Sequence, residues 1–144
     1  MKILGLMKAD EHSESGAPPS QDLLERMGNF VEEATKAGVL LAGDGLQPSR
    51  SGKRVELSEG KLSVIDGPFT ETKELVASYV LMQVQSIDEA VEWTRRFLDV
   101  LGQGRCELRP ILEFTDFPPE LQSAEVMAKE AATRERMQEN AAKS

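Results

Sequence analysis

The sequence predicts an α+β fold in which two β-α-β units share one antiparallel sheet, and three observations lead to this class. Two segments repeat apolar residues at steps of three and four, as helices with one buried face do. Each of these segments lies between short apolar runs of strand length. Of the 144 residues, 40% are hydrophobic and 29% are charged, which is ordinary for a globular domain with its own core.

The first β-α-β unit occupies the N-terminal third of the chain. Residues 1–7 are apolar at neighbouring positions, which favours a strand in the centre of the sheet. Residues 8–19 are polar and contain a glycine and two prolines, so we expect a loop there. Ser20 then provides the N-cap of a helix, and Gly38 ends it. Residues 39–42 form the second strand.

The second unit begins with a long strand over residues 75–84, both faces of which are apolar. Ser86 and Glu89 form the capping box of a second amphipathic helix. A last strand follows over residues 106–114. Pro110 lies within it and lacks an amide hydrogen, which favours an edge position in the sheet.

A hairpin is inserted between the two units. Val55 and Leu57 alternate with polar neighbours, and so do Leu62 and Val64 beyond the turn at residues 58–60. This alternation predicts two paired strands with one face in water. Without the hairpin, the order of elements is that of the ferredoxin-like fold, in which two helices cover one face of an antiparallel sheet.

The two-sided apolar character of the first and the long central strand has a consequence for assembly. Two helices cover only one face of such a sheet, so something else must cover the other face. A second copy of the same sheet is the economical solution. We therefore expect a homodimer in which the two sheets face each other.

The C-terminal part of the chain differs in composition from the rest. From Pro118 onwards it is rich in Ala, Glu, Lys and Arg, and its weak apolar stripe has good helix propensity. We therefore divide the chain into a domain over residues 1–114 and a C-terminal helical tail over residues 115–144. The sequence leaves open whether this tail is frayed or lies on the dimer.

Charge and hydropathy exclude several classes of partner. The formal net charge is −8, and the only basic pairs, at residues 53–54 and 95–96, have no aromatic residues between them, so we expect no nucleic-acid partner. The longest apolar run, residues 75–82, is far shorter than the ~20 residues that span a bilayer, so we expect no membrane partner. A short N-terminal apolar run and the single Cys106 predict a cytoplasmic location.

The stretch IDGPFTETKE, residues 65–74, is the most unusual part of the chain. Asp66 and Gly67 are a strong turn signal, and Pro68 restricts the backbone further. A well-specified turn explains these three residues, but it does not explain the aromatic and charged residues that follow.

Phe69, Glu71 and Lys73 point to one side if this segment is extended. There they line a pocket that contains an acid–base pair, or they form an exposed ion pair worth about 0–1 kcal/mol. The sequence leaves both readings open.

The segments GDGLQP (residues 43–48) and DGPFTETKE (residues 66–74) resemble the YCII-related family, in the branch known for a DGPF-type motif. That branch usually shows DGPFAETKE and G-E-G-L-x-P, so Thr70 and Asp44 stand where alanine and glutamate are usual. The resemblance covers about residues 1–114. It implies a ferredoxin-like dimeric α/β barrel, and related barrels act on small organic molecules.

Several residues are candidates for a site at one end of this barrel. Asp44 and Gln47 follow the second strand in a glycine-flanked loop, where backbone approaches a ligand closely. As a hypothesis, Asp66 or Asp44 acts as a general base, and Lys73 holds an anionic or carbonyl oxygen. Tyr79 lies on a sheet strand, where it faces the barrel interior.

Other members of the wider family carry a His–Asp pair proposed as catalytic. The only histidine here, His12, lies in the predicted loop, so this mechanism does not carry over. His12 beside two acidic residues is also a poor metal site, and we expect neither metal nor cofactor. The predicted function is binding of a small organic molecule with metal-free acid–base catalysis of the isomerase or lyase type. The alternative is a non-catalytic regulatory or protein-interaction module.

Overall fold

The computed structural model describes residues 1–71 and 73–143 and divides the chain into two units, Met1–Ile111 and Leu112–Ser144. The elements of the first unit, in chain order, are β1 (Lys2–Lys8), α1 (Glu11–Ser15), α2 (Gln21–Lys36), β2 (Leu40–Gly45), η1 (Ser49–Ser51), β3 (Lys53–Ser58), β4 (Lys61–Asp66), β5 (Val76–Gln83), α3 (Ile87–Leu101) and β6 (Cys106–Pro110). The second unit holds η2 (Phe114–Asp116), η3 (Pro119–Leu121) and α4 (Ala124–Ala142).

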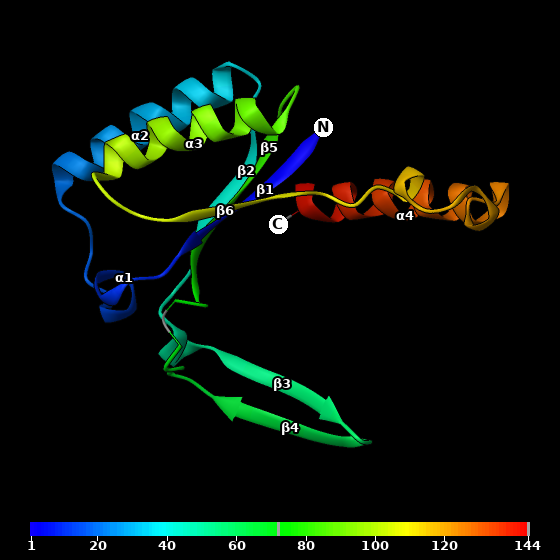
Figure 1. Cartoon of the computed structure of the whole chain (residues 1–144), viewed down its shortest axis with the longest axis horizontal. Helices are drawn as coiled ribbons and strands as arrows, with labels where there is room; N and C mark the ends of the chain where they lie inside the picture. The colour runs from blue at the N-terminus through cyan, green and yellow to red at the C-terminus, as the bar shows by residue number, and fades with distance from the viewer. Residues whose placement is uncertain (72, 144) are drawn as a thin grey trace. The chain divides into compact units, whose positions relative to one another are not determined.

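The main sheet has four strands in the order β2-β5-β1-β6, and all of its neighbours are antiparallel (Figure 1). This is the ferredoxin-like order, so the predicted α+β fold is confirmed. The central strands are β1 and β5, as their apolar sequences predict. The strand that contains Pro110 lies at an edge, where the missing amide hydrogen has no neighbouring strand to bond.

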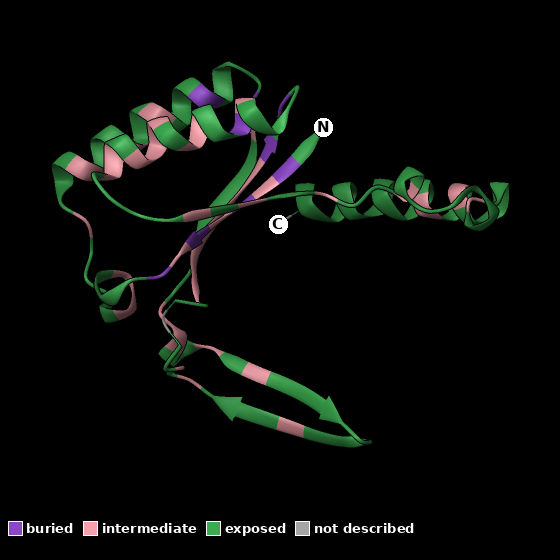
Figure 2. Cartoon of the chain, viewed as in Figure 1, coloured by how far each residue is buried: buried purple, intermediate pink, exposed green. Residues whose placement is uncertain are grey.

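Helices α2 and α3 cover one face of this sheet (Figure 1). In β1 the residues Ile3 and Met7 are buried, and the residues between them are not, apart from Gly5. The core beneath the helices is small, and purple marks it in Figure 2. Its buried members are Ile3, Val39, Met82, Val84 and Ala90, with Val80, Trp93 and Leu108 packed against them.

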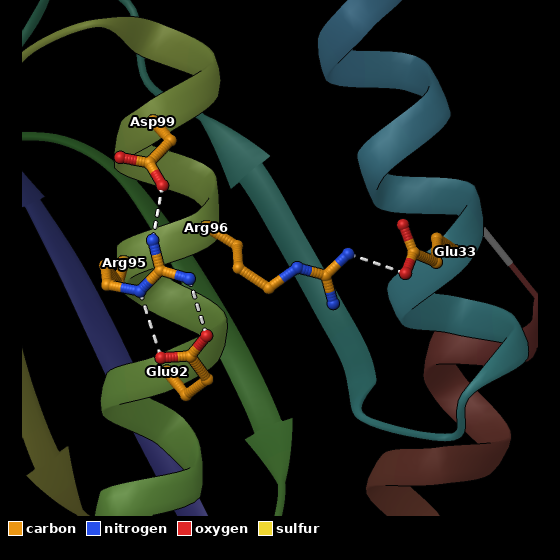
Figure 3. Close-up of polar contacts among 5 residues, drawn as sticks. All are labelled: Glu33, Glu92, Arg95, Arg96 and Asp99. Carbon is orange, nitrogen blue, oxygen red and sulfur yellow. Dashed lines mark hydrogen bonds and ion pairs between the residues drawn. The ribbon is translucent and has the colours of Figure 1, made fainter.

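Ion pairs join the outer surfaces of the two helices (Figure 3). The guanidinium of Arg96 on α3 lies 2.6 Å from the carboxylate of Glu33 on α2. Arg95 binds Glu92 and Asp99 within α3, each at 2.6 Å, and its hydrogen bonds lower the pKa of Glu92. These side chains are exposed, so their pairs orient the helix surfaces more than they stabilise the fold.

The predicted helix caps form, with one difference. Ser20 Oγ accepts from the Leu23 amide at 3.1 Å, and Ser86 Oγ accepts from the Glu89 amide at 3.2 Å. The Glu89 carboxylate accepts from the amide of Gln85 at 2.6 Å rather than from that of Ser86. The predicted capping box is therefore wrong in its second bond, which reaches one residue further back.

The prediction that residues 8–19 form only a loop is also wrong, because α1 lies within them. Asp10 caps this short helix: its carboxylate accepts from the Ser13 amide at 2.8 Å, and Ser13 Oγ accepts from the Asp10 amide at 2.9 Å. The hydrogen bond from the Ser13 amide is the largest influence on the Asp10 carboxyl and holds its pKa below the ordinary value. A reciprocal cap of this kind nucleates a single helical turn without any apolar periodicity.

The inserted hairpin forms as predicted, as a separate two-stranded sheet. Glu59 and Gly60 make its turn with φ angles of 51° and 78°, as a tight hairpin turn requires. The expectation that only one face is in water is wrong. The apolar face is exposed as well, and its four members are 57–73% exposed: Val55, Leu57, Leu62 and Val64.

The last strand is shorter than the predicted range of 106–114. The amide of Ile111 still donates to the carbonyl of Lys2 at 2.9 Å, and pairing with β1 stops there. Leu112 is 63% exposed and belongs to the second unit, and Phe114 opens a 3-10 helix. The apolar alternation beyond Pro110 therefore does not reflect a strand.

The C-terminal helical tail is confirmed as α4, which Ser123 caps through a 3.3 Å bond to the Val126 amide. None of its described residues is buried (Figure 2). Before it, the side-chain Nε2 of Gln122 donates to the carbonyls of Thr115 and Phe117, which joins the two 3-10 turns. In the described parts of both units, no helix has the length and apolar character needed to cross a membrane.

Replacing Ile3 by alanine tests the small core. Ile3 is fully buried between the sheet and the helices, so we expect Ile3→Ala to lower the free energy of unfolding by about 2–5 kcal/mol. Urea denaturation followed by circular dichroism measures the change. Leu57→Ala, at a residue that is 73% exposed, is the control and should change stability by no more than about 0.5 kcal/mol.

Candidate functional site

The DGPF turn is bound to two other segments of the first unit through Ser49. The hydroxyl of Ser49 donates to Glu14 at 2.5 Å and accepts from the Phe69 amide at 3.1 Å. The amide of Ser49 donates to the other oxygen of Glu14 at 3.0 Å. Glu14 lies on α1, Ser49 on η1 and Phe69 after β4, so one half-buried cluster joins three segments that are distant in sequence.

At Gly67 the backbone of the DGPF turn comes closest to the backbone of Ser49. A Cβ on Gly67 would lie 1.8 Å from the Ser49 carbonyl oxygen, which is far inside any real contact. Its amide donates to the carbonyl of Gly52 at 3.0 Å, and the peptide bond to Pro68 is cis. The sequence identifies Gly67 as a turn residue, but the absolute need for glycine comes from this backbone approach.

Phe69 and Glu71 lie against the hairpin. The guanidinium carbon of Arg54 is 4.0 Å from the centre of the Phe69 ring, and Arg54 also pairs with Glu71 at 3.4 Å. The condition of an extended segment is not met at Lys73 and Glu74, which lie in a turn, and the amide of Glu74 donates to the carbonyl of Glu71 at 2.9 Å. The sequence predicted that Glu71 lies beside Lys73, but in the structure the Glu71 carboxylate pairs with Arg54.

Asp66 and Lys73 lie in different surroundings. Asp66 forms an exposed ion pair with Lys53, the residue directly opposite it in the hairpin. Lys73 lines a shallow depression with Lys8 and Arg105, together with Glu74, Cys106 and Glu107. The structure therefore does not show Asp66 and Lys73 in a common pocket.

Asp44 and Tyr79 form a direct pair on neighbouring strands. The Tyr79 hydroxyl donates to Asp44 Oδ2 at 3.0 Å, and this hydrogen bond, with the carboxylate charge, raises the pKa of Tyr79. Asp44 lies within β2 and not in the predicted loop. Gly43 lies opposite Val80 in the pairing of β2 with β5. A Cβ at Gly43 would lie 3.1 Å from both the Tyr79 carbonyl oxygen and the Val80 side chain, so glycine permits the close approach of the two strands.

The Asp44–Tyr79 pair belongs to the sheet face opposite α2 and α3, here called the open face. Residues directly opposite each other in an antiparallel ladder share a face. Leu6 is opposite Tyr79 and Leu4 is opposite Leu81, whereas their neighbours in β1 lie under the helices. The members of the open face named by these registers are Leu4, Leu6, Ala42, Asp44, Tyr79 and Leu81.

Gln47 lines a different hollow from the open face. It is exposed and lies in a groove beside Glu14, Ser49 and Phe69, with Leu75 and Val76 at the far wall. The predicted site residues are thus distributed over the open face, the groove at Ser49, the hairpin and the Lys73 depression.

Sequence reasoning missed Glu14, Ser49 and Arg54, which hold the DGPF turn. Ser49 directly follows the GDGLQP segment and Arg54 alternates with the apolar residues of the hairpin, but neither pattern indicates which residue the side chain contacts. Within residues 1–71 and 73–143, no three His, Cys, Asp or Glu side chains gather as a metal site would require.

The fold and the DGPF turn define a ferredoxin-like domain with an inserted hairpin. A family model, the YCII-related domain, matches residues 1–115, and the chain belongs to this family. A curated relative, "Uncharacterized protein R00369" from Rhizobium meliloti (strain 1021), is 34% identical over 67 residues. The match covers 46% of this chain and 54% of that protein, so it spans about half of the relative's length.

A solved structure is also similar: 5-chloro-2-hydroxyhydroquinone dehydrochlorinase (TftG) from Burkholderia phenoliruptrix AC1100, in complex with 2,5-dihydroxybenzoquinone. The comparison covers 82% of this chain and all of that one, at 17% identity and a TM-score of 0.39. At these values it carries no inference about a ligand of the present chain.

Gly67→Ala tests the close approach at the DGPF turn. The new Cβ has no room beside the Ser49 carbonyl, so we expect a loss of about 1–3 kcal/mol in the free energy of unfolding. Gly28→Ala on α2 is the matched control, because nothing lies within 4 Å of its Cβ position and alanine favours the helix. Equal unfolding midpoints for the two variants would contradict the steric requirement.

Asp44→Asn tests the pair on the open face. Removing the carboxylate charge should move the pKa of Tyr79 down towards its ordinary value, because the charge disfavours the phenolate. Tyr79 is the single tyrosine, so absorbance at the phenolate band reports it alone. In the wild type, the stabilisation from this bond is complete below the pKa of an unfolded tyrosine and is lost as the pH rises through the raised folded value. An unchanged titration in Asp44→Asn would rule out the pair in solution.

Proposed function

We propose that this protein binds a small organic molecule on the open face of its sheet, within a homodimer whose two open faces enclose a barrel. The observation that carries the proposal is the composition of this face. Leu4, Leu6 and Leu81 lie beside one polar pair, Asp44 and Tyr79. The ion pair of Glu107 and Arg109 on β6 lies at the edge of the same face. Ligand sites are typically apolar, with a few convergent polar groups that orient the ligand.

The homodimer follows from the same face. Neither α2 nor α3 covers it (Figure 1). Its leucines are half-buried in the single chain. Burial of each Å² of apolar surface contributes about 25 cal/mol. A second copy supplies an identical apolar surface, and a two-fold axis lets each face cover the other.

Metal-free acid–base chemistry is the reaction class that the polar pair supports. Asp44 is better placed than Asp66 as the general base, because Asp66 is engaged with Lys53 on the exposed hairpin. The raised pKa keeps the Tyr79 phenol protonated, and its one hydrogen is donated to Asp44 Oδ2. The Tyr79 oxygen can therefore accept a hydrogen bond from a ligand while the second oxygen of the Asp44 carboxylate accepts a proton. Such a pair suits isomerase- or lyase-type proton transfer on a small organic substrate.

Native mass spectrometry of the purified protein at micromolar concentration tests this function. We expect a dimer, and Leu81→Asp should convert it to a monomer, because a carboxylate on each open face would be buried without a partner. Tyr79→Phe should keep the dimer and lose any small molecule that purifies with it. A monomeric wild-type protein would refute both the proposed barrel and the ligand site within it.

A second candidate, a protein-interaction module, is favoured by the hairpin. Val55, Leu57, Leu62 and Val64 form an exposed apolar face on a two-stranded sheet, which by itself is marginally stable in water. Leu57→Asp separates the two readings. If it dissociates the dimer and Leu81→Asp does not, association runs through the hairpin and not through the open face.

A further inference from the structure

The depression lined by Lys73 has an unusual charge for this protein. The chain carries a net charge of −8, yet Lys8, Lys73 and Arg105 all line this one hollow. Two acidic residues also line it, Glu74 and Glu107. The depression therefore has a local excess of positive charge on an acidic molecule.

These three cations have no ion-pair partner among the described residues. The Glu107 carboxylate lies 3.4 Å from Arg109 instead. Several other cations of the first unit are paired, such as Lys53 with Asp66 and Arg54 with Glu71. Three like charges held together without partners repel one another, so an anion placed between them gains from all three.

Backbone hydrogen bonds join the three chain segments that carry these cations. The amide of Lys8, at the end of β1, donates to the carbonyl of Arg105 at 2.9 Å. The next amide, of Ala9, donates to the carbonyl of Leu75 at 2.9 Å, two residues after Lys73. The cations thus come from three neighbouring chain segments that are joined at the hollow itself, which limits the ordering that ligand binding would require.

We propose that Lys8, Lys73 and Arg105 form a binding site for the oxyanion group of a small molecule, a carboxylate or a phosphate. Arg105 offers a planar fork that bonds two oxygens at once, and the two lysines add point charges and freely rotating donors. The site borders the open face, because Glu107 of the depression lies opposite Leu6, but its three cations are distinct from the Asp44–Tyr79 pair. It requires neither the dimer nor Asp44 and Tyr79.

An NMR titration tests the proposal. Inorganic phosphate is added to ¹⁵N-labelled protein in one series and acetate in another, with sodium chloride keeping the ionic strength constant. We expect saturable shifts of the backbone amides of Lys8, Lys73, Arg105 and Cys106. Saturation by phosphate alone identifies a phosphate site, and saturation by acetate identifies a carboxylate site. Shifts that fail to saturate in both series would overturn the proposal.

Variants check that the three side chains hold the anion. Lys73→Ala and Arg105→Ala should each raise the dissociation constant of the anion about tenfold, because each variant loses a charged hydrogen bond. Lys61→Ala removes a cation at the hairpin turn and is the matched control, with no change expected. Equal binding by Lys73→Ala, Arg105→Ala and Lys61→Ala would also refute the site. Binding that persists in Leu81→Asp and Asp44→Asn shows that this site stands even if the proposed function on the open face fails.

Discussion

Two helices cover only one face of the four-stranded sheet, and the rest of the structure depends on this constraint. The buried core lies beneath α2 and α3 and is small, with Ile3 as its fully buried large side chain. On the opposite face the leucines of β1 and β5 pack against neither α2 nor α3. The surface around Asp44 and Tyr79 is therefore shaped by what the helices leave uncovered.

The DGPF segment is part of a junction between distant segments of the first unit. Gly67 fits against the Ser49 carbonyl, and the Ser49 hydroxyl bridges Glu14 and the Phe69 amide. This junction joins α1, η1 and the start of the chain segment that leads to β5. Because that segment also carries Lys73, the same turn places a cation beside Lys8 and Arg105. One motif thus supports the fold and supplies the basic depression.

Much of the fold could be predicted from the sequence, because its signals are local. Apolar steps of three and four mark α2 and α3, Ser20 and Ser86 mark where they begin, and Pro110 marks an edge strand. Two of the predictions that failed concern segments whose structure depends on contacts outside an apolar pattern. The single turn of α1 depends on the Asp10–Ser13 cap, and the alternation beyond Pro110 extends no strand.

The sequence by itself determined the two β-α-β units, the hairpin, the C-terminal helix and the need for a turn at Gly67, because each follows from periodicity, capping or backbone freedom within a few residues. The tertiary structure alone decided which charges meet. Arg54 forms an ion pair with Glu71, and Lys53 forms one with Asp66. The Asp44 carboxylate accepts a hydrogen bond from the Tyr79 hydroxyl. These partners are 13 to 35 residues apart. Strand register and loop course set such distances, and no short stretch of sequence encodes either one.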